Sequence, residues 1–229
     1  MEHPIFFITK LFEAIGLGPF AHAYPHVTYT WLIMLLLMVL SFLAVKSIKM
    51  VPAGGQNLFE MVISGIESFQ VDTMGEHGRP FFPILATLGI FIFLSNVMGL
   101  LPGFYSPTAS INTTLACALI VFVMTHIIGI KTHGFKYIKQ FLGPIWWLAP
   151  LMFPIEIISH LSRVLSLTLR LFGNIMGEDL VLMILLFLAG KFLAPLPMMF
   201  LALFTSFIQA FVFVLLSMIY FSSALEEAH

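Results

Sequence analysis

An arginine stands in the middle of a mostly apolar stretch that is long enough to cross a lipid bilayer. The stretch runs from Pro154 to Leu188, and Arg170 lies near its centre, within Leu-Ser-Leu-Thr-Leu-Arg-Leu-Phe-Gly-Asn. A charged side chain at the centre of a bilayer costs roughly 2.5–3.5 kcal/mol on insertion scales. Because charges retained at such a cost mark ion and proton pathways, Arg170 is the first candidate functional residue.

Several polar residues share a helical face with Arg170. At about 100 degrees per residue, they fall within about 40 degrees of Glu156 on a helical wheel. This polar stripe consists of Glu156, His160, Arg163, Arg170, Asn174 and Glu178, with Ser159 and Ser166 beside it. From Glu156 to Glu178 it would extend ~33 Å as a helix, about the thickness of the hydrocarbon core. So long a stripe must face protein or water. A polar seam that joins helices is the alternative, and it can hold for Ser159 or Ser162 individually.

The residue types of the stripe favour proton movement. Carboxylates and histidine exchange protons within an accessible range, whereas arginine stays protonated. Arg170 is therefore a fixed charge, suited to holding a carboxylate ionised and to barring the direct passage of a cation. Gln209, in the last apolar run, is predicted to position Arg170, to line a channel or to join helices. Asn96 and Asn112 are weaker candidates, because both could cap or join helix ends at the outer surface.

The composition indicates the kind of fold that positions these residues. The chain is 60% apolar and only 9% charged, whereas soluble domains carry about a quarter charged residues. We therefore expect an all-α polytopic membrane protein with a single integral domain over residues 1–229. A net charge of −1 without a basic stripe gives no support for nucleic-acid binding, and a single cysteine excludes an intrachain disulfide. No phosphate-binding Gly-x-x-x-x-Gly-Lys loop occurs, and the loop histidines lack metal-ligand spacing.

Apolar runs predict five membrane-crossing helices and one amphipathic helix on the membrane surface. The crossings are expected at residues 30–45, 81–101, 112–130, 144–188 and 197–225, the surface helix at 56–73, and an outer N-terminal segment at 1–29. The last two crossings are long and should be strongly tilted. The fourth is either tilted or broken near Pro150 or Pro154.

Positive charges predict the orientation in the membrane. Most basic residues fall in two loops on one side, namely Lys46, Lys49, Arg79, Lys131, Lys136 and Lys139. Only Lys10 and Lys191 fall on the opposite side. Since cytoplasmic loops carry the excess of lysine and arginine, the N-terminus should lie outside and Glu226-Glu227 inside. Without a signal-peptide pattern or a transit-like leader at the N-terminus, a bacterial inner membrane is the expected location.

The motif around Arg170 resembles the signature of the a subunit of F-type ATP synthases. It reads Ser166-Leu-x-x-Arg170-Leu-Phe-Gly-Asn174 and is followed by Glu178-Asp179. The resemblance extends over nearly the whole chain. Further motifs stand in the expected order: Asn96-x-x-Gly-Leu-Leu-Pro102, Pro107-Thr-Ala-Ser-Ile-Asn112, Pro154-x-Glu156 and Gln209-Ala-Phe-x-Phe.

The resemblance implies a non-catalytic stator subunit in the membrane sector, without a cofactor. Its expected partners are a ring of small helical-hairpin subunits that carry the ion-binding carboxylate, the peripheral-stalk subunits and the lipid bilayer. Two offset half-channels would lead to the ring, and Arg170 would separate them. Asn174 and Gln209 match positions beside that arginine. Glu178 and Asp179 match the outer half-channel, and Glu156 matches an acidic position of the inner one.

Two departures from the family pattern affect the predicted outer path. Ser110 stands where many members have aspartate, and Ala202 stands where some members place a histidine. The outer path must then rely on Glu178, Asp179 and water. Helical geometry favours Glu178 and the matched position favours Asp179, so both stay candidates.

The coupling ion, H⁺ or Na⁺, also stays open, because the binding carboxylate would lie on the ring. The alternative function is a self-contained ion channel or secondary transporter. It is disfavoured because the chain has no convincing internal repeat.

Overall fold

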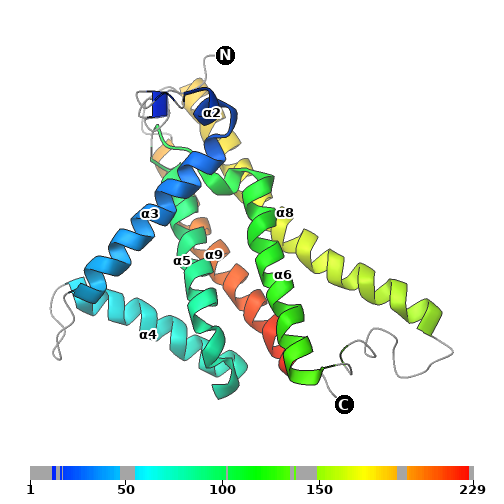
Figure 1. Ribbon diagram of the computed structural model, residues 1–229. Helices are drawn as coiled ribbons and strands as arrows, with labels where there is room; N and C mark the ends of the chain where they lie inside the picture. Colours follow the sequence, from blue (N-terminus) through cyan, green and yellow to red (C-terminus); the bar gives the residue numbers. More distant parts are fainter. Residues whose placement is uncertain are drawn as a thin grey trace.

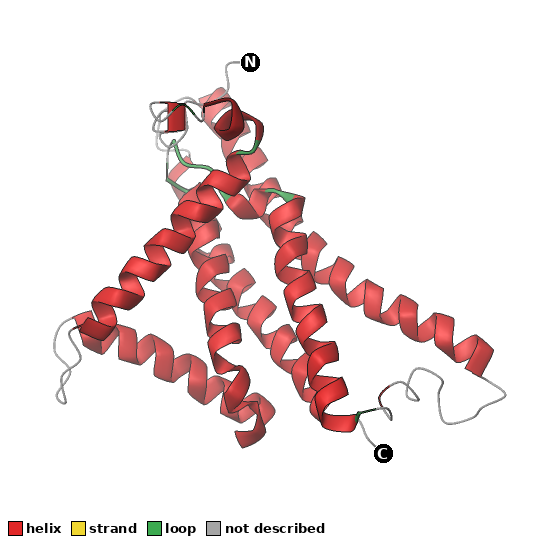
Figure 2. Ribbon diagram, in the orientation of Figure 1, coloured by secondary structure: helices red, strands yellow, loops and turns green. Residues whose placement is uncertain are grey.

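The computed structural model describes residues 12–13, 16, 18–46, 55–101, 103–134, 137, 149–189 and 195–226, and within these ranges every regular element is a helix (Figure 2). The α-helices are α2 (Gly18–Ala23), α3 (Pro25–Lys46), α4 (Gly55–Met74), α5 (Phe82–Gly99), α6 (Ile111–His133), α8 (Ala149–Ala189) and α9 (Pro195–Glu226). Two short 3₁₀ helices are η1 (Glu76–Phe81) and η2 (Pro107–Ala109).

Five of these segments are long and apolar enough to span a membrane, which confirms the predicted fold class. They are Pro25–Ala44, Glu76–Gly99, Ile111–His133, Pro150–Leu188 and Pro195–Leu225. The amphipathic α4 is inclined steeply to α5 and runs across the lower end of the molecule in Figure 1.

The fourth crossing is one uninterrupted helix rather than a broken one. α8 has 41 residues, so it is about 60 Å long, roughly twice the thickness of the hydrocarbon core. It must therefore be tilted, and Figure 1 shows it running obliquely behind α6. Pro154 lies inside α8 near its start, where the missing N–H removes only one hydrogen bond close to a helix end. Residues 144–148, which were also expected to be helical, lie outside the described residues.

The antiparallel helices α5 and α9 form the centre of the bundle, and α6 packs against both α8 and α9. Gly89 of α5 permits a close approach, because a Cβ atom there would lie 2.7 Å from Cγ2 of Val214 on α9. Phe93 and Phe207 pack edge to face across the same two helices, with ring centroids 6.3 Å apart. α9, held in this way by α5, also packs against α8.

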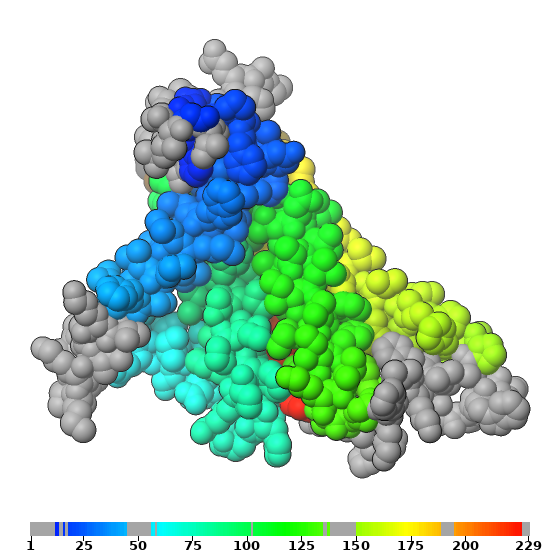
Figure 3. All heavy atoms as spheres, viewed as in Figure 1, coloured from blue at the N-terminus to red at the C-terminus, as the bar shows by residue number. Residues whose placement is uncertain are grey.

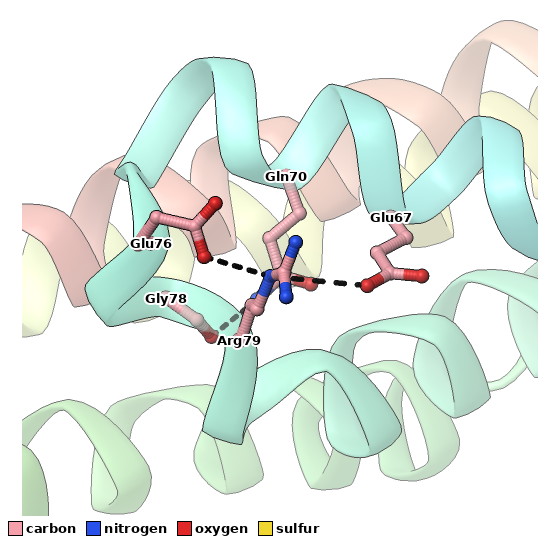
Figure 4. A network of polar contacts seen from close by, with 5 residues as sticks. All are labelled: Glu67, Gln70, Glu76, Gly78 and Arg79. Atoms are coloured by element: carbon pink, nitrogen blue, oxygen red, sulfur yellow. Dashed lines mark hydrogen bonds and ion pairs between the residues drawn. The ribbon is translucent and has the colours of Figure 1, made fainter.

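α4 is fixed to the rest of the bundle by apolar and polar contacts. Phe69 stacks against Phe211 of α9 at 5.0 Å between centroids. Figure 4 shows how the end of α4 is joined to η1. The buried Gln70 donates a hydrogen bond from Nε2 to the carbonyl oxygen of Gly78. Arg79 Nε lies 2.9 Å from Glu76 and 4.0 Å from Glu67. These bonds fix the direction in which the chain enters α5.

Outside α8, the basic residues that the structure describes gather at one end of the bundle. Arg79 in η1, Lys131 in the last turn of α6 and the C-terminal end of α3 all lie at the lower end in Figure 1. The remaining lysines on which the predicted orientation depends, Lys10, Lys49, Lys136, Lys139 and Lys191, lie outside the described residues.

Candidate functional site

Arg170 lies on the outer surface of the bundle, near the middle of α8. Its side chain is exposed, whereas its neighbours Leu167 and Leu171 are only 3% and 0% exposed. These two leucines hold this part of α8 against the bundle and leave the arginine at the edge of the packed face. Arg170 Nη2 donates one long hydrogen bond of 3.4 Å to Ser166 Oγ. Among the described residues, no carboxylate lies within ion-pair distance of Arg170.

Most of the surface of α8 is exposed and could meet a partner. Only 11% of the residues in its membrane-spanning window are buried, compared with 44% for the span that contains α5. Figure 3 shows the N-terminal part of α8 (yellow-green) extending beyond α6 with its surface uncovered in this view. The exposed side chains on this part are largely apolar, such as Leu161, Leu165 and Leu169. Such a surface suits lipid or another membrane helix.

One turn beyond Arg170, a hydrogen bond joins α8 to α9. Asn174 Nδ2 donates to Gln209 Oε1 at 2.8 Å, and Gln209 is only 4% exposed. The sequence predicted Gln209 as a positioner of Arg170, as a channel lining or as a link between helices. The structure pairs Gln209 with Asn174 instead of Arg170, so its effect on the arginine would pass through the backbone of α8.

The two adjacent acidic residues of α8 face different neighbours. Glu178 lies within hydrogen-bonding reach of Thr205 on α9. Asp179 lies close to Tyr105, in the loop between α5 and η2. Burial, together with the negative charge of Asp179, raises the pKa of Tyr105. Ala202, where some members of the resembled family have a histidine, is buried in α9. The two carboxylates therefore lie beside different polar side chains, Thr205 and Tyr105.

Asn96 and Asn112, the weaker candidates, flank the loop that contains Tyr105 and η2, but in different surroundings. The buried Asn96 accepts a hydrogen bond of 2.6 Å at Oδ1 from Thr108 of η2. Ser106 donates a hydrogen bond to the carbonyl oxygen of Ser95 at 2.9 Å and so fixes the same loop. Asn112 is exposed in the first turn of α6.

The inner part of the polar stripe, from Glu156 to Arg163, is covered by α6 and α9. His160 Nε2 lies 3.4 Å from Glu156 Oε1, and their side chains are 14% and 41% exposed. The guanidinium of Arg163 stacks over the ring of Tyr220 on α9, 5.3 Å from its centroid. A cavity of ≈10 Å³, room for about one water, lies between α6, α8 and α9. Leu167, one turn before Arg170, lines its far wall.

The stripe is therefore not one continuous surface, as the helical wheel suggested. α6 and α9 cover its part from Glu156 to Arg163, Gln209 bonds to Asn174 nearer the Glu178 end, and Arg170 between them is exposed. Sequence reasoning missed two side chains from other helices that lie beside the stripe. Tyr220 of α9 stacks on Arg163, and His126 of α6 has its ring centroid 5.0 Å from that of His160. Since His126 is an ionisable group within the third apolar run, its residue type was a usable signal. No group of three or more histidine, cysteine or acidic side chains is arranged to hold a metal ion in the described part of the chain.

Comparison with known proteins agrees with the geometry of α8. A family model described as "ATP synthase A chain" matches residues 27–222. The chain is 62% identical to ATP synthase subunit a of Syntrophobacter fumaroxidans, 61% identical to that of Desulfosudis oleivorans and 57% identical to that of Geobacter sulfurreducens. Each comparison covers 100% of both chains. This chain belongs to the ATP synthase A chain family.

Proposed function

We propose that the chain is the proton-translocating stator subunit of an F-type ATP synthase. The observation that carries this proposal is the exposed Arg170 at the middle of a membrane helix, without a carboxylate partner among the described residues. A fixed charge in this place is costly unless a partner compensates it. A ring subunit that presents a carboxylate to the open face of α8 would do so.

Two groups of proton-exchanging residues flank Arg170 along α8. Glu156 precedes it by about 21 Å of helix, and Asp179 follows it by about 14 Å. His160 belongs to the inner group and Glu178 to the outer one. We assign the inner group to the half-channel from the cytoplasm and the outer group to the half-channel from the outside. Arg163, Ser166, Asn96 and Asn112 are supporting polar residues.

Arg170 couples ion flow to rotation because it cannot release its proton. A proton that arrives from one side binds a ring carboxylate and cannot pass the arginine directly, since the like charge repels it. When that carboxylate comes round to Arg170 on the other side, the guanidinium favours its ionised form and the proton leaves. Each charge that crosses down 100 mV releases about 2.3 kcal/mol, which drives the turning of the ring.

The proposed function also implies an orientation in the membrane and neighbouring subunits. The basic end of the bundle faces the cytoplasm of a bacterial inner membrane, with the N-terminus outside. The peripheral stalk holds the subunit while the ring turns. The subunit itself is non-catalytic and binds no nucleotide, so ATP chemistry belongs to other subunits of the complex.

Substitution of Arg170 tests the proposal directly. In inverted membrane vesicles that contain the whole complex, Arg170→Ala should reduce coupled ATP synthesis to background. Arg170→Lys should also fail substantially, because a lysine lacks the planar group with five donors. Lys131→Ala is the control, since it removes an exposed cation in the last turn of α6, outside the site. Synthesis at the wild-type rate in Arg170→Ala would contradict the proposal. Ion conduction by the purified chain alone in liposomes would favour a self-contained channel.

A further inference from the structure

A second ionisable group lies beside the inner part of the polar stripe, on a different helix. His126 belongs to α6, about 10 Å of helix before its lower end. Its ring centroid lies 5.0 Å from that of His160 on α8. Glu156 approaches His160 from the preceding turn, at 3.4 Å. Two proton-exchanging side chains from two helices therefore converge on one histidine.

The hydrogen bond of His126 selects which ring nitrogen can exchange a proton. Nδ1 lies 2.8 Å from the carbonyl oxygen of Phe122. Because a carbonyl oxygen only accepts, Nδ1 must carry a hydrogen in this geometry. In the neutral ring, Nε2 is then the nitrogen without a hydrogen, and its lone pair can accept a proton. His126 is thus oriented as a proton acceptor with a fixed tautomer.

Packing holds His126 in this orientation. Phe122 stacks on its ring at 4.2 Å between centroids, and Tyr137 packs edge to face at 6.0 Å. Tyr137 fits closely because Gly129 has no side chain, and a Cβ atom there would collide with the tyrosine ring. A loosely held histidine on a lipid-facing surface would have none of these contacts.

The negative charge of Glu156 attracts a proton towards His160. Glu156 Oε1 lies 3.4 Å from His160 Nε2, and Arg163, further along α8, stacks on the ring of Tyr220. The cavity of ≈10 Å³ is lined by His160 and Arg163 and extends towards Leu167. A proton that reaches His160 therefore has a water-sized space between it and the level of Arg170.

We propose that His126 is a second proton-carrying residue of the cytoplasmic path, and that His126 and Glu156 deliver protons in parallel to His160. The inference rests on the proposed function, to which it adds a residue on another helix. In each transfer, Nε2 of neutral His126 takes a proton from cytoplasmic water and forms an imidazolium. The imidazolium gives this proton to neutral His160, directly or through one water. His126 returns to its starting form, with Nδ1–H still donated to Phe122.

ATP-driven proton uptake by inverted membrane vesicles tests the parallel arrangement, because the cytoplasmic face of the complex is then in contact with the buffer. The variants are Glu156→Gln, His126→Asn, the two combined, and His160→Asn. Asparagine at 126 can still donate towards the Phe122 carbonyl but cannot carry a proton. Since either Glu156 or His126 would sustain transport without the other, the double variant should be at least about tenfold slower than either single variant. His160→Asn should be as slow as the double variant, because both residues deliver protons to His160.

A histidine elsewhere on α6 provides the matched control. His133 lies two turns further on, with Nε2 3.2 Å from the carbonyl oxygen of Ala224 on α9. His133→Asn in the Glu156→Gln background should cause no further loss. His126→Gln, measured in parallel, separates a packing defect from the loss of the imidazole, and all rates are normalised to assembled complex. A double variant no slower than Glu156→Gln would overturn the inference. Arg170→Ala in the same vesicles tests the proposed function separately.

Discussion

The hydrogen bond between Asn174 and Gln209 predicts that exchanging these two residues preserves stability. Either substitution made alone should destabilise the protein. The length of the bond is 2.8 Å from Nδ2 to Oε1. Glutamine has one methylene more than asparagine, so exchanging the two residues leaves the combined reach unchanged. Gln209→Asn alone withdraws the amide by about 1.5 Å, one carbon–carbon bond, and opens the gap to about 4 Å, too long for a hydrogen bond. Asn174→Gln alone lengthens the combined reach by about 1.5 Å and forces the two amides against each other. The swapped variant should restore the contact.

The cost of each single change follows from the burial of Gln209. An interhelical hydrogen bond in a membrane averages about 0.6 kcal/mol and reaches about 1.7 kcal/mol. A buried polar group left without its partner costs about 1–3 kcal/mol, and residue 209 has no access to water to recover this loss. We therefore expect each single variant to lose about 1–3 kcal/mol of stability. The swap should recover most of it.

The assay heats vesicles that contain the whole complex and then measures the ATP-driven pumping that survives. Both single variants should lose pumping at lower temperatures than the wild type, and the swap should lie close to the wild type. Asn112→Gln serves as the control, because Asn112 is an exposed asparagine outside this contact. If the losses of the two single variants simply add in the swap, the contact between these two amides is not what joins α8 to α9 at this level.

Two further predictions concern packing and charge near the site. Gly89→Ala should destabilise the bundle by about 1–3 kcal/mol, because the new methyl group would overlap Val214, whereas Gly65→Ala, with open space around it, should be neutral or slightly stabilising in the same thermal assay. Asp179→Asn should lower the pKa of Tyr105 towards its ordinary value, because it removes a negative charge that disfavours the phenolate, while burial keeps the pKa above that value. Titration of ring-labelled tyrosine by NMR measures this shift, and an unchanged Tyr105 would show that Asp179 does not face it.

The membrane-spanning helices could be predicted because each depends on its own residues. Long apolar runs interrupted by glycine, proline and lysine locate the crossings, and the length of the fourth run already required a tilt. The integrity of α8 through Pro154 could not be predicted. A proline this close to a helix end removes little hydrogen bonding, so the packing of the following residues decides whether the helix continues.

The candidate site could be predicted only as far as one helix carries it. A helical wheel shows which side chains share a face, but not what covers that face at each level. The crossing of α8 by α6 and α9 decides that His160 is covered while Arg170 is open. The periodicity of a helix also does not reveal how far the helix is shifted along its axis relative to a neighbour. The sequence therefore could not show that Gln209 of α9 lies beside Asn174 of α8 rather than beside Arg170. His126 was missed because it is isolated in its own helix and gains a partner only through packing.

The unequal surroundings of the stripe explain how one helix can both admit protons and refuse them passage. Glu156, His160 and Asn174 have partners within the chain, so their places are held whether or not a ring subunit is beside them. Arg170 has only the long bond to Ser166, and the roughly 2.5–3.5 kcal/mol that its burial in lipid would cost is not offset within the described residues. Under the proposed function, a carboxylate on the ring would offset this cost only while it is ionised. The site would therefore be most stable with a deprotonated ring subunit facing the arginine. A subunit that still carried its proton would meet an uncompensated charge instead, so passage past Arg170 would require release of the proton first.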